Sequence, residues 1–229
     1  MREALRRITI FAGHLGSGKT ELAINFALKL AAQDLPTSLV DLDVVNPYFR
    51  TRLVRERLEG LGLTVICPRG EWERADLPAL PPVIRGVLED HTRYGVFDVG
   101  GDDVGATVLG RFKPQLEQAG YHLWLVVNAC RPFTRNEKSI LKVLAGIERA
   151  CRMRVTGLVS NTNLGPATDM DVVLAGHRVV QEAARKLGLP VVLLGVRREL
   201  VGAGRRDLPR DVALLPLDLY MQSSRPEAL

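Results

Sequence analysis

The sequence predicts an α/β fold, a three-layer sandwich in which helices cover both faces of a mostly parallel sheet. Three observations support this prediction. Short runs rich in Val, Leu and Ile alternate with longer segments that carry apolar residues at helical spacing. The short runs alternate only partly between apolar and polar residues, which is typical of parallel strands buried on both faces. Several longer segments end at Gly, a common helix stop. Alternation of strand and helix gives a parallel sheet with right-handed crossovers.

Taken in chain order, each apolar run except the last is followed by one helical segment. The predicted strands are 7–13, 37–43, 63–67, 94–101, 121–129, 154–161 and 190–196. The predicted helices are 18–33, 49–60, 82–91, 106–120, 135–150 and 172–188. No linker divides the chain, so we expect residues 1–229 to form a single domain. Ligands bind beyond the carboxyl ends of such strands, so the segments that follow the runs should gather at one edge.

Composition and charge exclude several classes of function. The net charge is +5 and the pI about 9.4, but the basic residues are spread along the chain, so nucleic-acid binding is not expected. The sequence has no apolar stretch of membrane-spanning length and no signal-peptide pattern, which predicts a cytoplasmic protein without a membrane anchor. Cys67, Cys130 and Cys151 form no paired motif, and we expect them to be small buried side chains.

The segment FAGHLGSGKT, from Phe11 to Thr20, contains the pattern Gly-x-x-x-x-Gly-Lys-Thr between a predicted strand and a predicted helix. In that position the pattern is typical of a phosphate-binding P-loop. The glycines let backbone N–H groups turn toward an anion, and the helix N-terminus adds its dipole. We expect Lys19 to reach the β- and γ-phosphates and the Thr20 hydroxyl to hold Mg²⁺. The residues predicted to contact the nucleotide here are Gly13, His14, Leu15, Gly16, Ser17, Gly18, Lys19, Thr20 and Glu21.

A magnesium site beside a P-loop needs an acid from a distant strand. Asp98 ends a hydrophobic strand and is predicted to hold Mg²⁺ through water, because Mg²⁺ keeps several waters and few carboxylates. The spacing Asp98-x-x-Gly101 predicts that the Gly101 N–H faces the γ-phosphate. Asp102 and Asp103 follow, and for them capping of the next helix is an equally good interpretation.

A third acidic pair lies in the segment SLVDLDVVNP, where Asp41 and Asp43 are two positions apart at a strand end. Asp43 is our candidate to orient the attacking water, and it joins Lys19 as a predicted catalytic residue. Asp41 is the candidate to support the metal together with Thr20 and Asp98. The alternative interpretation is that these acids cap the turn after the strand.

Five segments together resemble the MinD/ParA/CobQ-type P-loop ATPases of the SIMIBI class, which also includes signal-recognition GTPases and dethiobiotin-synthetase-like ligases. They are GHLGSGKT, LVDLDVVNP, VFDVGGDD, GLVSNTN and LLGVRREL, and the resemblance covers about residues 7–200. It implies a P-loop NTPase fold with a seven- or eight-stranded sheet, ATP with Mg²⁺, and often an ATP-bridged homodimer. It also implies that Asn161 contacts the base. A GTPase usually shows Asn-Lys-x-Asp, whereas this segment reads NTNL, which favours adenine.

The chain departs from that family at His14, which stands where the family has a lysine that reaches across the dimer, and Leu15 follows where a Gly would stand. A neutral imidazole does not replace a fixed positive charge, although His titrates near neutral pH. An arginine finger could do the same work. Candidates at the predicted edge are Arg50, Arg52, Arg131 and Arg135. For each of them the alternative is a solvated surface arginine.

Two further segments at that edge, VVNPYFRTR and PRGEWERADLPALPP, combine prolines, aromatics and arginines. Such residues are favoured at recognition surfaces. With CRPFTRN, they are predicted to form a site beside the γ-phosphate for an anionic small molecule or a partner protein. The alternative is that the aromatic residues pack beneath the loops.

These observations favour a Mg-dependent ATP-binding protein, a slow ATPase that acts as a nucleotide-dependent switch on a partner. The alternative is a small-molecule kinase or an ATP-dependent ligase of the dethiobiotin-synthetase-like type. No nucleophile constellation is present in the sequence, in line with catalysis by positioning and electrostatics. A metal-insertion NTPase is disfavoured because the sequence lacks a His-rich tract and a paired-Cys motif.

Overall fold

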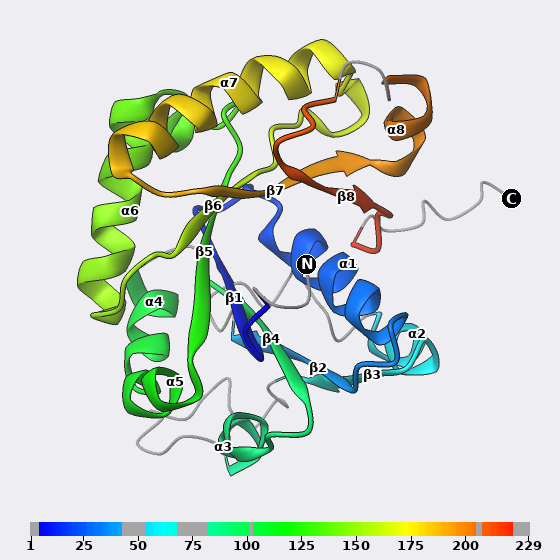
Figure 1. Ribbon diagram of the computed structural model, residues 1–229, viewed down its shortest axis with the longest axis vertical. Helices are drawn as coiled ribbons and strands as arrows, with labels where there is room; N and C mark the ends of the chain where they lie inside the picture. Colours follow the sequence, from blue (N-terminus) through cyan, green and yellow to red (C-terminus); the bar gives the residue numbers. More distant parts are fainter. Residues whose placement is uncertain (1–4, 43–53, 68–81, 101–102, 205–207, 222–229) are drawn as a thin grey trace, which may run out of the picture.

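Parallel strands form one twisted sheet with helices on both faces (Figure 1). The computed structural model describes residues 5–42, 54–67, 82–100, 103–204 and 208–221. Within these residues the sheet has eight strands in the order β3-β2-β4-β1-β5-β6-β7-β8, and every neighbouring pair is parallel. The strands are β1 (Ile8–Ala12), β2 (Thr37–Leu42), β3 (Leu63–Ile66), β4 (Tyr94–Val99), β5 (Tyr121–Val127), β6 (Gly157–Ser160), β7 (Val191–Arg197) and β8 (Ala213–Leu217).

The helices follow the strands in alternation, as the predicted crossovers require. They are α1 (Lys19–Ala31), α2 (Arg55–Gly60), α3 (Pro82–Glu89), α4 (Asp103–Gly110), α5 (Lys113–Ala119), α6 (Glu137–Cys151), α7 (Met170–Leu187) and α8 (Arg198–Gly204). Two short 3₁₀ turns, η4 (Pro132–Thr134) and η5 (Gly165–Ala167), follow β5 and β6. None of the helices in the described ranges is long and apolar enough to span a membrane.

The strands are buried on both faces, as their apolar sequences predict. In β1, Ile8 and Ile10 belong to the hydrophobic cluster under the helices α3 to α7, whereas Phe11 belongs to the cluster under α1 and α2. Full burial of one such side chain contributes about 1.5–3 kcal/mol. The alternation therefore holds β1, at the centre of the sheet, from both sides.

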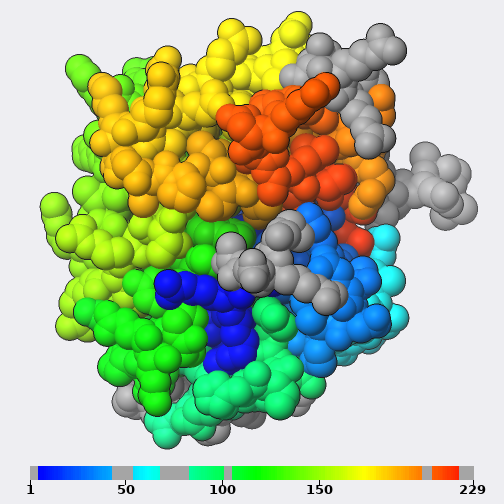
Figure 2. Space-filling view, viewed as in Figure 1, coloured from blue at the N-terminus to red at the C-terminus, as the bar shows by residue number. Residues whose placement is uncertain are grey.

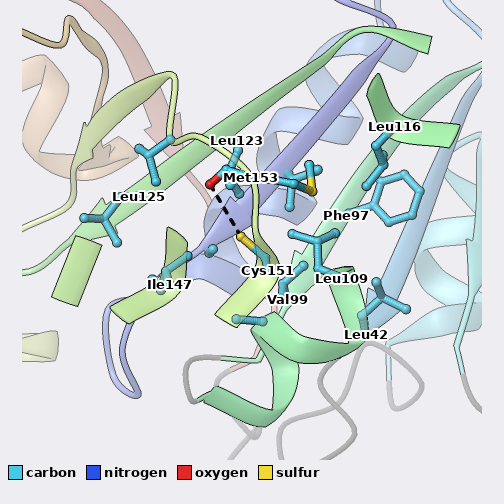
Figure 3. Packing of buried hydrophobic residues seen from close by; sticks show 14 of the residues in the cluster. Leu42, Phe97, Val99, Leu109, Leu116, Leu123, Leu125, Ile147, Cys151 and Met153 are labelled. Carbon is cyan, nitrogen blue, oxygen red and sulfur yellow. Dashed lines mark hydrogen bonds between the residues drawn. The ribbon is translucent and has the colours of Figure 1, made fainter. Parts of the chain in front are cut away.

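Cys151 lies within the first of these clusters (Figure 3). Its thiol is fully buried and donates to the Met153 carbonyl at 3.8 Å, and burial raises the pKa of the Cys151 thiol. The prediction of a small buried side chain is thus confirmed for Cys151. It is wrong for Cys130, which is exposed, and Cys67 is only half-buried.

Three aromatic rings attach α1 to the sheet. Phe11 of β1, Phe26 of α1 and Trp124 of β5 pack edge to face, with centroid distances of 5.5, 5.5 and 5.4 Å. Each such pair contributes about 0.5–1.5 kcal/mol beyond the burial of its area. The start of α1, where the predicted P-loop ends, is therefore fixed relative to β1 and β5.

The seven predicted strands are all present. Their ends shift by up to three residues, and the predicted ends at 43 and 101 lie outside the described residues. The strand β8 was not predicted from the sequence, because Pro216 interrupts its apolar pattern. As an edge strand, β8 tolerates a proline that a central strand would not. The predicted helix 106–120 is wrong in extent: it is two helices, because Pro114 fits only the first turn of α5. Beyond the last predicted strand, Arg198–Gly204 forms the helix α8, which was not predicted from the sequence.

The close approach of α7 to the end of β6 supplies a stability test. A Cβ on Gly176 of α7 would lie 2.1 Å from Thr162 Oγ1, so Gly176→Ala should destabilise the protein by about 1–3 kcal/mol. Gly146 of α6 has no neighbour within 4 Å of such a Cβ, and Gly146→Ala should stabilise by about 0.5–1 kcal/mol. Urea unfolding measures both, and a Gly176→Ala variant as stable as the wild type would contradict the packing.

Candidate functional site

The loop between β1 and α1 has the backbone of an anion cradle. Gly16 and Gly18 adopt φ values of 78° and 82°, which favour glycine. A Cβ on Gly13 would lie 2.6 Å from the Val126 carbonyl oxygen, so this glycine lets the loop leave β1 close beside β5. Gly18 is the N-cap of α1 without a side-chain cap, which leaves first-turn N–H groups for another acceptor. Lys19, the first residue of α1, is 5% exposed.

The metal ligands predicted from distant parts of the sequence meet at this loop. Thr20 Oγ1 donates to Asp98 Oδ2 at 2.6 Å, and the Asp98 side chain is buried at the end of β4. Asp41 on β2 is the register partner of Asp98 on the adjacent strand. A hydroxyl and carboxylate oxygens suit Mg²⁺, which prefers oxygen ligands and keeps several waters. In the described ranges, no group of three or more His, Cys, Asp or Glu side chains could hold a metal by itself. The Thr20 hydroxyl and the two carboxylates fit Mg²⁺ as oxygen ligands.

Several predicted residues lie outside the described ranges. They include the predicted catalytic Asp43, the predicted phosphate sensor Gly101, the candidate arginines Arg50 and Arg52, and the aromatic and proline-rich segments of the second site. Of the four candidate arginines, Arg131 and Arg135 are described, and both are exposed.

Asn161, predicted to contact the base, supports the P-loop. Its Nδ2 donates to the Ser17 carbonyl at 2.8 Å, and its side chain is buried. A Cβ on Gly18 would lie 2.4 Å from Asn161 Nδ2, and a Cβ on Gly195 would lie 2.6 Å from Oδ1. The amide is thus packed between the P-loop and β7. The base contact remains a prediction. In the structure, Asn161 supports the backbone of the P-loop.

Asn128, which sequence reasoning missed, joins three segments at the same edge. Its Nδ2 donates to the Asn163 carbonyl at 3.1 Å and to the Gly16 carbonyl at 3.4 Å. Its Oδ1 accepts from the Cys130 and Asn163 N–H groups at 3.0 and 3.2 Å. The side chain is 0% exposed. One signal was present in the sequence, because an Asn directly follows the apolar run of β5 at the edge where ligands bind.

A cavity of about 560 Å³ opens beside the P-loop. Its polar end is formed by the loop and the start of α1, and its apolar part by side chains of α7 and of β7, β8 and the chain beyond. The lining residues are Leu15, Gly16, Gly18, Lys19, Thr20, Glu21, Arg131, Asn161, Thr162, Asn163, Gly165, Thr168, Val173, Gly195, Val196, Arg197, Leu217, Leu219 and Met221. Gly13, His14 and Ser17 are not among them. The cavity has the composition of a small-molecule site, mostly apolar with a few placed polar groups.

Glu21, predicted as a nucleotide contact, builds one wall of this cavity. Its carboxylate accepts from the Tyr220 N–H at 2.9 and 3.0 Å and from the Met221 N–H at 2.7 Å. Burial raises the pKa of the Glu21 carboxyl, and the two backbone donors oppose that shift. Figure 2 shows the last described residues, in red, beside the blue surface of α1. The chain after β8 is therefore held to the helix that follows the P-loop.

A second set of contacts fixes the same segment. Asn25 Nδ2 donates to the Asp218 carbonyl at 2.8 Å, and Asn25 Oδ1 accepts from the Asp218 N–H at 2.9 Å. Arg198 of α8 donates through Nε and Nη2 to the two oxygens of Asp218, each at 2.7 Å. Arg198 lowers the pKa of the Asp218 carboxyl, chiefly through its side-chain hydrogen bonds. The chain after β8 is thus joined to α1 and α8 through both backbone and side-chain contacts.

His14, at the tip of the P-loop, packs against an aromatic side chain. Its ring stacks on Phe133 at a centroid distance of 4.2 Å and an interplanar angle of 24°. Leu15 and Phe133 are 56% and 58% exposed. The loop tip therefore presents an apolar, aromatic surface.

Comparison with known proteins gives a likeness of fold. No protein-family model and no curated protein matches the chain. FtsY from Thermotoga maritima superposes with a TM-score of 0.55 at 20% identity over 82% of this chain and 61% of that one. FlhF complexed with GTP and Mg²⁺ gives 0.51 at 13% identity over 82% and 64%. FtsY from Elizabethkingia anophelis with GDP gives 0.50 at 14% over 81% and 55%. The chain spans about three fifths of the length of these structures, and it has an α/β, P-loop NTPase-like fold.

The wall held by Glu21 can be tested directly. Glu21→Ala removes the acceptor of the Tyr220 and Met221 amides, so the free energy of unfolding should fall by about 1–3 kcal/mol. Hydrogen exchange at these two amides should also become faster. Glu117→Ala, which removes an exposed acid paired with Lys113, is the control and should cost less than about 0.5 kcal/mol. Unchanged exchange at residues 220 and 221 in Glu21→Ala would show that another contact holds the wall.

Proposed function

We propose that the chain binds ATP together with Mg²⁺ in this cavity, hydrolyses it slowly, and acts as a nucleotide-dependent switch on a partner. One observation carries the proposal. A complete P-loop and the Thr20–Asp98 hydrogen bond lie together at the polar end of a cavity, and the other part of this cavity is apolar. The polar end suits a phosphate chain, and the apolar part suits a base.

The residues that would hold Mg²⁺ are Thr20 and Asp98, with Asp41 beside them. When bound, the ion neutralises charge on the phosphate oxygens. Lys19 supplies a positive charge at the first position of α1, and the loop N–H groups supply hydrogen bonds. Asp43 is proposed to orient the attacking water. Catalysis of this kind rests on positioning and charge rather than on a covalent intermediate.

The cavity supports adenine over guanine. Guanine presents two neighbouring N–H donors, and a site that selects it must offer acceptors for both. Among the described residues of the lining, Glu21 carries the one carboxylate, and it already accepts from the Tyr220 and Met221 amides. Leu164 stands where a GTPase would have an acid. The FlhF complex with GTP and Mg²⁺ supports a magnesium-bound nucleotide in general.

Nucleotide titration tests the proposal. Lys19→Ala should weaken ATP binding roughly 10- to 100-fold, because a charge-assisted contact contributes about 1.5–3 kcal/mol. Lys29→Ala, at the last turn of the same helix, is the matched control and should bind as the wild type does. Calorimetry with ATP and GTP, each with and without Mg²⁺, provides the measurement. Wild-type protein that binds neither nucleotide would overturn the proposal, and preference for GTP would overturn the choice of base.

A further inference from the structure

Arg131 follows the end of β5 and lies against the P-loop. Its Nε donates to the Gly16 carbonyl at 3.1 Å, and it belongs to the lining of the cavity. A Cβ on Gly16 would lie 3.0 Å from Arg131 Nε and 3.4 Å from Cζ. Because Gly16 has no side chain, the Arg131 guanidinium can lie against the loop at this position.

The backbone that carries Arg131 is held in place. The Arg131 N–H donates to the Asn128 carbonyl at 3.0 Å, and the Thr134 N–H donates to the Arg131 carbonyl at 3.0 Å. The buried Thr134 hydroxyl donates to the Asn128 carbonyl at 2.7 Å. Asn128 also holds Gly16, so loop and arginine share one support. The backbone at Arg131 is therefore ordered before a ligand binds, which lowers the conformational cost of binding.

The Arg131 guanidinium has N–H groups besides the one that contacts Gly16. It carries five N–H groups, of which Nε–H is used by Gly16. Within the described ranges, its terminal nitrogens have neither an acid nor a carbonyl acceptor. Arg197, the other arginine of the lining, differs: it donates to Glu199 at 3.1 Å and to the Gly165 carbonyl at 3.4 Å.

We propose that Arg131 is a phosphate ligand of the bound nucleotide, with its terminal N–H groups donating to phosphate oxygens at the P-loop end of the cavity. The inference rests on the proposed nucleotide binding and adds a second positive charge, from the same chain, to that of Lys19. A phosphate suits Arg131 because the planar guanidinium can donate to two phosphate oxygens at once. The contact with Gly16 places it at the loop and not at the apolar part formed by Val173 and Val196.

The test compares nucleotides with a nucleoside. ATP, ADP and adenosine are titrated into the wild type, Arg131→Ala, Arg131→Gln and Arg131→Lys. Arg149→Ala, which removes an exposed arginine from α6, is the control for net charge. Arg131→Ala and Arg131→Gln should weaken ATP and ADP roughly 10-fold or more and leave adenosine unchanged, while Arg131→Lys recovers part of the loss. The salt dependence of ATP binding should fall in the first two variants.

The outcomes separate the inference from the function on which it rests. If the wild type binds ATP and Arg131→Ala binds it equally well, Arg131 is not a phosphate ligand. Equal weakening of ATP and adenosine would assign Arg131 a structural role in supporting the loop, and would also overturn the proposal. Wild-type protein that binds no nucleotide would refute the proposed function itself. Thermal unfolding of each variant, expected to match the wild type, excludes a folding defect as the cause of weaker binding.

Discussion

Two buried amide side chains hold the P-loop in its shape. Asn161 donates to the Ser17 carbonyl, and Asn128 donates to the Gly16 carbonyl. A cradle for an anion must turn N–H groups inward, and its carbonyl groups then need partners elsewhere. Loss of such a partner in a buried place costs about 1–3 kcal/mol. The loop is therefore shaped by strands β5 and β6 as well as by its own glycines.

The strand order explains why these groups meet. Because β1 lies between β4 and β5, the loop after β1 receives acids from one side and amides from the other. Asp98 of β4 accepts from Thr20 on the first side. Asn128 and Asn161, after β5 and β6, support the loop on the second. The strand order reverses at this point, with β2 and β3 on one side of β1 and β5 to β8 on the other, and open α/β sheets bind ligands at such a point.

The sequence predicted the parts of the site that depend on local pattern. The P-loop, the acid at the end of β4 and seven of the eight described strands each have a short signature of residue types. The contacts that complete the site have no such signature, since they join residues far apart in the chain. Asn128 reaches Gly16 over 112 positions, and Glu21 reaches the Tyr220 amide over 199. Glu21 follows the P-loop directly, yet its partners became apparent only when the chain after β8 was placed.

If Asn128 and Asn161 hold the P-loop in its binding shape, the proposed nucleotide enters without rearrangement of the loop. A crystal structure with Mg²⁺ and a non-hydrolysable ATP analogue tests it most directly. The account predicts phosphates against the segment from Gly16 to Thr20, the base in the apolar part of the cavity, and both Asn side chains still bonded to the loop. A nucleotide bound outside this cavity, or a loop released from Asn128 and Asn161, would contradict it.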